Sequence, residues 1–174
     1  MSLIELDDGD IYQGEYDTET EQIDGRGRHI WSNGNVYDGL WKNDQHDGYG
    51  RHIFNNRGYY IGEWKDGNMN GYGKYYQEDG DIYEGQWLNN NKEGLGLNKW
   101  CDGGQYFGQW VNGEAQGFGV FTCENGDIEV GQWMDGYKHG IQLYIPVDGG
   151  QIEISRYEND ELIETLLEID QSQE

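Results

Sequence analysis

The sequence repeats itself every 23 residues, and this period constrains the fold more than any other feature. Pairs of glycines separated by one residue mark the period, with first members Gly25, Gly48, Gly71, Gly94 and Gly117. Gly140 continues the series, but Gln142 stands where the second glycine is due. A short unit at a fixed period is typical of solenoids, in which each unit buries its apolar surface against its neighbours. We therefore expect an elongated array rather than a globular core.

A second motif, Tyr-x-Gly-x-Trp, runs in phase with the glycine pairs. In a β-strand alternate residues share a face, so Tyr60, Gly62 and Trp64 would point the same way. The missing side chain at Gly62 leaves room for a ring to lie across the backbone. The equivalent residues are predicted to form two structural aromatic columns, Tyr12, Tyr37, Tyr60, Tyr83 and Tyr106, and Trp41, Trp64, Trp87, Trp110 and Trp133.

Each repeat also contains residue pairs that predict turns. Asn-Gly or Asp-Gly pairs such as Asn33-Gly34 and Asp79-Gly80 separate successive repeats, and such pairs are strong hairpin signals. Inside each repeat we expect a polar loop, residues 65–70 in the third one. The predicted fold is all-β: a single-layer antiparallel β-meander solenoid of 23-residue hairpin repeats, about six and a half of them over residues 1–158.

Residues 159–174 read differently from the repeats. Leu162, Ile163, Leu166, Leu167 and Ile169 follow Asn159-Asp160-Glu161 at spacings that fit an amphipathic helix, so an acidic tail that is helical to about residue 170 is predicted. Such a helix would either cover the open edge of the last hairpin or dock a partner through Leu162 and Leu166. The sequence leaves both readings open.

One face of the predicted sheet changes character along the chain. Three residues after each first glycine stand Arg28, Arg51 and Lys74 in the first half, but aliphatic residues in the second. An apolar strip on an open sheet needs a cover. The tail, a second copy of the chain or a different protein could supply it. The candidate partner-binding residues on this face are Leu97, Phe118, Val120, Ile141 and Leu143.

Two motifs locked at one period over residues 7–157 resemble the MORN repeat family (membrane occupation and recognition nexus). Departures are a first repeat with two extra residues, Glu129 in place of a tyrosine and Gln142 in place of a glycine. The resemblance implies a non-enzymatic scaffold that binds proteins in cytoskeletal, axonemal or junctional assemblies, as a homodimer in some members. The alternatives are association with phosphoinositide membranes or membrane junctions, and a regulatory fragment of an enzyme.

Charge bears on these alternatives. With 34 acidic and 11 basic residues the net charge is −23, which opposes binding to nucleic acids and to anionic membranes. His29 and His52 hold the same repeat position and could form a two-histidine metal site, but no further ligands stand at suitable spacing, and aromatic packing is the preferred reading. No catalytic or cofactor-binding signature is found. We expect a cytoplasmic protein, placed on the cytoskeleton or in the cilium by the resemblance alone.

Overall fold

The computed structural model describes residues 2–5 and 9–170, and every regular element in them is a β-strand. The chain divides into two units, residues 1–90 and 91–174. The first unit contains β1 (Ser2–Glu5), β2 (Ile11–Asp17), β3 (Gln22–Ile30), β4 (Val36–Lys42), β5 (Gln45–Phe54), β6 (Gly58–Lys65), β7 (Asn68–Tyr76) and β8 (Ile82–Leu88). The second contains β9 (Asn91–Lys99), β10 (Gln105–Val111), β11 (Glu114–Thr122), β12 (Ile128–Met134), β13 (Tyr137–Ile145), β14 (Gln151–Glu158) and β15 (Glu161–Asp170).

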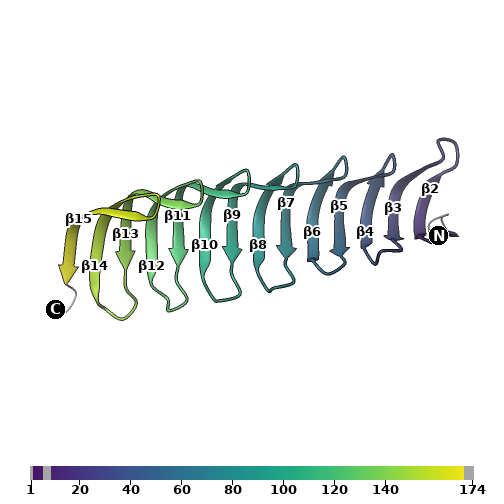
Figure 1. Ribbon diagram of the computed structural model, residues 1–174. Coiled ribbons are helices and arrows are strands. Elements are labelled where there is room, and N and C mark those ends of the chain that lie inside the picture. Colours follow the sequence, from purple (N-terminus) through teal and green to yellow (C-terminus); the bar gives the residue numbers. More distant parts are fainter. Residues whose placement is uncertain (1, 6–8, 171–174) are drawn as a thin grey trace. The chain divides into compact units, whose positions relative to one another are not determined.

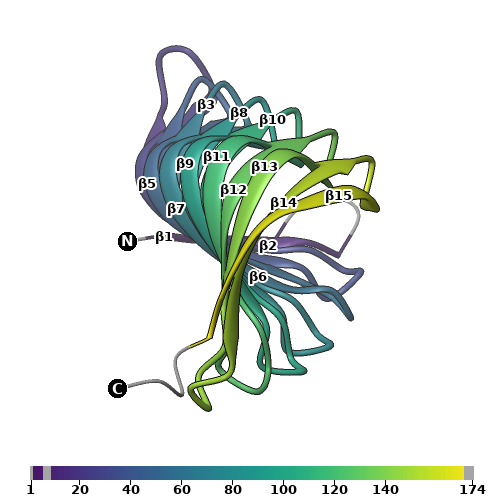
Figure 2. The ribbon, with the colours of Figure 1, turned by 90° about the vertical axis from the view of Figure 1, so that its left-hand side faces the viewer.

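Within each unit the strands pair antiparallel and in chain order, so that consecutive strands are neighbours (Figure 1). The register places glycine opposite glycine, as in Gly62 with Gly73 and Gly108 with Gly119. A bulge follows, between Gly62 and Trp64 in β6, and bulged strands bend, as Figure 2 shows. The all-β, single-layer meander predicted from the repeat is confirmed.

Two kinds of turn join the strands. Inside a repeat the turn has two residues with positive φ, such as Asn43 (47°) and Asp44 (63°), as in a type I′ hairpin. The six-residue loop expected at 65–70 is therefore wrong: β6 ends at Lys65 and β7 begins at Asn68. Strands pair to the edge of the turn because Asn, Asp and Gly tolerate positive φ.

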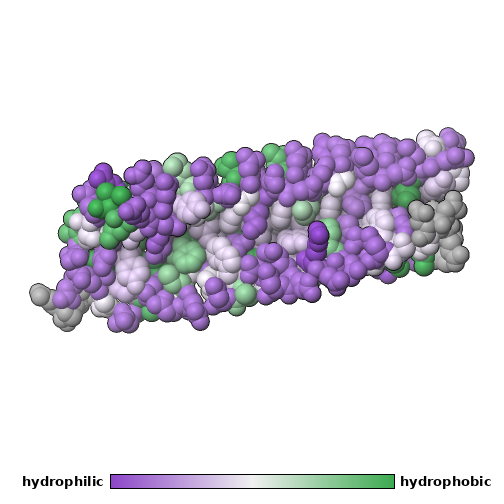
Figure 3. Space-filling view, viewed as in Figure 1, coloured by the Kyte–Doolittle hydropathy of each residue, from purple (hydrophilic) through white to green (hydrophobic). Residues whose placement is uncertain are grey.

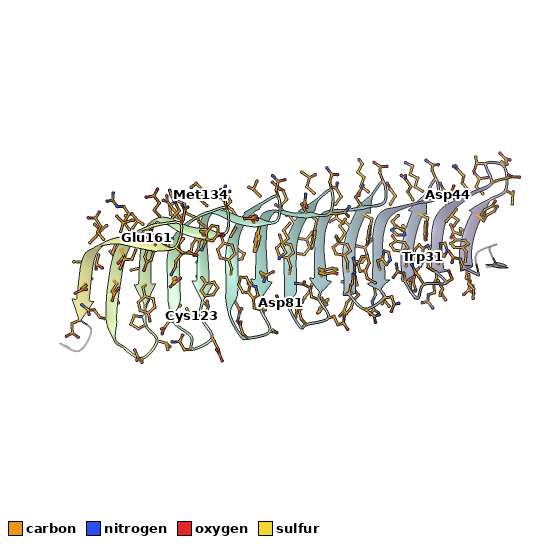
Figure 4. All side chains as sticks on the ribbon, in the orientation of Figure 1. Trp31, Asp44, Asp81, Cys123, Met134 and Glu161 are labelled. Carbon is orange, nitrogen blue, oxygen red and sulfur yellow. The ribbon has the colours of Figure 1, made fainter. Side chains whose placement is uncertain are left out.

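Between repeats the turn is one residue longer. The carbonyl of Trp31 accepts from the Gly34 N–H (2.9 Å), and the Trp31 N–H donates to the Asn35 carbonyl (3.0 Å). With Gly34 at φ 90° this is the three-residue hairpin that ends in a glycine bulge. The two kinds of turn lie at opposite ends of the strands, with Asp44 at one end and Asp81 at the other in the first unit (Figure 4).

The predicted C-terminal helix is wrong, because residues 161–170 form strand β15 and pair with β14. Asn159 (φ 51°) and Asp160 (φ 65°) make the same two-residue turn as in the earlier repeats. Asp160 is tied to β13, since its carboxylate accepts from the Lys138 N–H (2.6 Å). A turn that reverses the chain delivers 161–170 to the edge of β14, where the ladder satisfies backbone groups that would otherwise lie open.

The core lies on the face that carries the glycines, which we call the aromatic face. The five column tyrosines are at most 2% exposed and the five tryptophans at most 7%. The tyrosine rings lie over glycine: a Cβ at Gly73 would stand 2.1 Å from the Tyr60 hydroxyl oxygen. Pale and green residues run along the middle of the strands in Figure 3, with mostly purple ones at the turns.

Polar atoms of the two columns bond to the backbone. The Tyr60 hydroxyl donates to the carbonyl of Glu63 (3.0 Å), at the bulge, and equivalent bonds are made by Tyr12, Tyr37, Tyr83 and Tyr106. The Trp64 indole Nε1 donates to the Gly50 carbonyl (3.3 Å) one hairpin earlier. The tyrosines therefore fix their own bulges and the tryptophans tie each hairpin to the one before it, and the buried OH and NH groups are hydrogen-bonded.

Candidate protein-interaction surface

The opposite face of the second unit presents a continuous apolar row. Residues between the column positions point away from the aromatic face, and the strand register sets them side by side. One residue from each strand, β9 to β15, forms what we call the apolar row: Leu97, Phe107, Val120, Val130, Leu143, Ile154 and Leu167.

Further apolar side chains flank this row and stand out from the sheet. Phe118 is 65% exposed, and Leu95 and Ile141 are also exposed. In the part of the second unit that the structure describes, all regular elements belong to one sheet, so no second layer covers the row. A contiguous apolar surface rimmed by polar residues is the usual mark of an interaction site.

The first unit has a polar row at the equivalent positions. Its members are Gln13, Arg28, Asp38, Arg51, Ile61, Lys74 and Glu84. Neighbouring charges pair across strands, with Arg28 Nε 3.0 Å from Asp38 and Lys74 Nζ 3.3 Å from Glu84. The charged side chains of this row keep it hydrated. The equivalent row of the second unit is apolar.

The structure brings together five of the seven residues that the sequence suggests for partner binding. Leu97, Val120 and Leu143 belong to the apolar row, and Phe118 and Ile141 flank it. Leu162 lies elsewhere, because it pairs with Tyr157 and so points to the aromatic face. Leu166 occupies a bulge between Thr165 and Leu167, and no partner on β14 faces it. Sequence reasoning missed Phe107, Val130 and Ile154, which only the register places in the row.

The aromatic face departs from its pattern in the last repeats. Glu129 stands in the tyrosine column, and its carboxylate lies 3.0 Å from Lys138 Nζ. Burial lowers the pKa of Lys138, but the hydrogen bond and charge of Glu129 outweigh it, so this pKa lies above its ordinary value. Lys138 is therefore a charged, paired cation at neutral pH.

The histidines of the first unit pack among rings. Trp31 stacks between His29 (4.2 Å) and His52 (5.3 Å), so the two imidazoles do not face each other. His29 Nε2 instead lies 3.0 Å from an Asp10 oxygen. Among residues 2–5 and 9–170, no three His, Cys, Asp or Glu side chains come together as metal ligands would. Nor does that part of the chain contain a helix able to cross a bilayer.

Comparisons with known proteins agree with the repeat. The family model described as the MORN repeat matches residues 22–36, 37–59, 60–82, 83–105, 106–128 and 130–141. A search of curated proteins found no match.

Two solved structures are similar at low identity. The SAS-4 (dCPAP) TCP domain of Drosophila melanogaster, in complex with a proline-rich motif of Ana2 (dSTIL), is 15% identical with a TM-score of 0.45, over 95% of this chain and 88% of that one. The wild-type TCP10 domain of Danio rerio CPAP is 14% identical with a TM-score of 0.28, over 95% and 99%.

Proposed function

Because the chain belongs to the MORN repeat family, we propose that it is a non-enzymatic scaffold that binds another protein through the apolar row of its second unit. The observation that carries the proposal is the row itself, seven apolar side chains aligned by register on an uncovered sheet face. Removing apolar surface from water is favourable by roughly 25 cal/mol per Å². A partner that covers the row gains that free energy without any rearrangement of the sheet.

The family also supports a place for this scaffold in a cytoskeletal or ciliary assembly. The partner we propose is a protein segment with an apolar side of its own, because the row offers few polar groups to a hydrophilic ligand. The charge of −23 opposes the alternative of a phosphoinositide membrane, since anionic leaflets attract basic segments at about 1 kcal/mol per residue.

Self-association is a second candidate, and β15 favours it. All of β15 is exposed, and five of its ten residues are leucine or isoleucine. An edge strand of this kind is a template for pairing with a second chain. We propose that a homodimer, where it forms, uses this edge at the C-terminal repeats.

The double variant Val120→Glu/Leu143→Glu tests the scaffold proposal. Both charges fall in the apolar row, on the open face of the sheet, where water can solvate them without unfolding. Tagged parent and variant would be used for affinity capture from the cell of origin, with partners quantified by mass spectrometry. We expect specific partners to be lost from the double variant while its circular dichroism stays that of the parent.

The matched control is Ile61→Glu, which places the same charge in the equivalent row of the first unit. Ile61 lies between Arg51 and Lys74, so the new carboxylate has cationic neighbours and the sheet tolerates it. Capture by this variant should equal that of the parent. Retention of every partner by the double variant would exclude the apolar row as the interface.

A further inference from the structure

The aromatic face of the second unit contains a pocket of about 520 Å³. Its aromatic walls are Trp100, Tyr106, Trp110, Phe121 and Trp133. Glu114, Ala115, Glu129, Lys138 and Asp160 complete the lining, with Gly113 and Gly136 at the turns. The pocket lies on the opposite face of the sheet from the apolar row, so a ligand in the pocket does not contact that row.

The repeat supplies a filled copy of this pocket within the same chain. Three periods earlier, 69 residues back, the same walls recur with one change, a histidine for Phe121: Trp31, Tyr37, Trp41, His52 and Trp64. In that copy the central space is occupied by the imidazole of His46. Its ring stacks on Tyr37 at 3.6 Å and 9°, and its centroid lies 4.6 Å from Trp41 and 5.0 Å from Trp64.

The residue equivalent to His46 is Ala115, which ends at Cβ. The space that the imidazole fills over Tyr37 is therefore open over Tyr106. A flat group about the size of an imidazole fits there without any change to the walls, because the first unit already holds such a group. The geometry selects a planar ligand that stacks on Tyr106 and meets the edges of Trp110 and Trp133.

Charge decides which planar group this is. The two positions that are Tyr60 and Met69 in the filled copy are Glu129 and Lys138 in the pocket. Lys138 is already paired with Glu129 at 3.0 Å, and Glu114 and Asp160 add two more carboxylates, so the lining is net negative. A cation of this chain already uses one of these rings, since Lys92 Nζ lies 4.7 Å from the Trp110 ring centroid.

We propose that the pocket binds the guanidinium group of an arginine side chain presented by a basic segment of a protein partner. Guanidinium is planar, keeps its charge, stacks on aromatic faces and pairs with carboxylates through several donors. The group would stack on Tyr106, as His46 stacks on Tyr37, and bond to the Glu129 carboxylate in the lining. The net charge of −23 steers a basic segment toward the chain.

The test uses the full chain and two short peptides, acetyl-Gly-Arg-Gly-amide and its citrulline counterpart. Citrulline has nearly the shape of arginine but no charge. Binding is followed by NMR through the indole N–H signals of Trp100, Trp110 and Trp133. We expect the arginine peptide to shift these signals and the citrulline peptide to bind about tenfold more weakly, a factor that corresponds to about 1.4 kcal/mol.

Ala115→His is the decisive variant, because it refills the pocket with the ring that the first unit already accommodates. It should abolish binding of the arginine peptide, and Glu129→Gln, which removes the carboxylate, should weaken binding about tenfold. Met69→His is the matched control, since it places the same ring at the equivalent position of another repeat and should bind like the parent.

Three results would overturn the proposal. The first is an absence of indole shifts with the arginine peptide, and the second is equal binding of arginine and citrulline peptides. The third is unchanged arginine binding in a folded Ala115→His variant, or in Glu129→Gln should Ala115→His fail to fold. The Val120→Glu/Leu143→Glu variant should bind the arginine peptide normally, so failure of the scaffold proposal and failure of this one are distinguishable.

Discussion

The side-chain Nε2 of Gln142 donates a hydrogen bond to the backbone carbonyl of Gln132. In the preceding repeat the equivalent carbonyl, that of Gln109, accepts from the Tyr106 hydroxyl (3.4 Å). Gln142 stands where a glycine is due, and Glu129 stands where a tyrosine is due. The glutamine, 3% exposed, therefore takes over both the space and the hydrogen bond of the missing ring.

This exchange predicts strong coupling between positions 129 and 142. Gln142→Gly should cost roughly 1–3 kcal/mol, because it opens a gap and leaves a carbonyl unpaired. Glu129→Tyr should also destabilise, since its ring would meet Gln142. The double variant restores the pattern of the other repeats. Urea unfolding should therefore show a loss of stability at least about 1 kcal/mol smaller than the sum of the losses in the two single variants. Additive costs would contradict the exchange.

The tryptophan column should carry much of the stability of the first unit. Trp87 is 7% exposed, lies 5.4 Å from Tyr60 and 5.1 Å from Tyr83, and bonds to the Gly73 carbonyl (3.3 Å). Trp87→Ala should cost roughly 3–5 kcal/mol. Tyr16, in the first repeat, is 40% exposed, and Tyr16→Ala should cost far less. Equal shifts of the two denaturant midpoints would show that the columns do not stack as described.

The stability of the first unit should fall in mild acid. Burial lowers the pKa of His46 to about 3 and that of His52 to about 4. An unfolded histidine titrates near 6.5, so the unfolded chain binds more protons below that pH. The stabilising contribution is complete above about pH 6.5 and is lost as the pH falls toward 4, by roughly 2 kcal/mol for each histidine at pH 5.

His46→Phe checks this pH dependence while keeping a flat ring over Tyr37. Denaturant unfolding of parent and variant at pH 7 and pH 5 should show a smaller loss of stability in the variant. Comparison at matched pH cancels the effect of the many carboxylates. An identical loss in both proteins would mean that His46 does not resist protonation in the folded state.

The last hairpin presents the edge at which we propose self-association. Removing residues 159–174 takes away β15 and leaves the edge of β14, which carries Ile152 and Ile154 in place of the five leucines and isoleucines of β15. We expect the shortened chain to self-associate less than the parent, as seen by light scattering at equal concentrations. A rise in association would instead show that β15 protects the edge of β14.

The period of the sequence predicts most of this fold, and the reason is physical. A ring can cross the backbone only over glycine. The positions of Tyr60, Gly62 and Gly73 therefore predict which residues pair across the strands and which face carries the rings. The helix predicted for the tail is wrong because two bulges in its pairing with β14 disturb the strand-like alternation of Leu162, Ile163 and Leu166. The apolar spacing that results resembles that of an amphipathic helix.

The candidate sites were less accessible to sequence reasoning. The apolar row depends on register, which sets Phe107 beside Leu97 and Val120, although Phe107 precedes its glycine whereas the other two follow theirs. The pocket did leave a signal, namely the small Ala115 at a position that other repeats fill with Ile23, His46, Met69 or lysine. Reading that signal requires knowing that His46 covers Tyr37, which is a fact of packing.

The position shared by His46 and Ala115 gives the array a way to diversify. The regular repeats hold their strands by glycine, tyrosine and tryptophan, and none of these residues needs the side chain at that position. A single substitution per hairpin can therefore replace an aromatic ring by a cation or a methyl group while the residues that hold the sheet stay unchanged. New ligand preferences can evolve repeat by repeat in such a chain, without passing through unfolded ancestors.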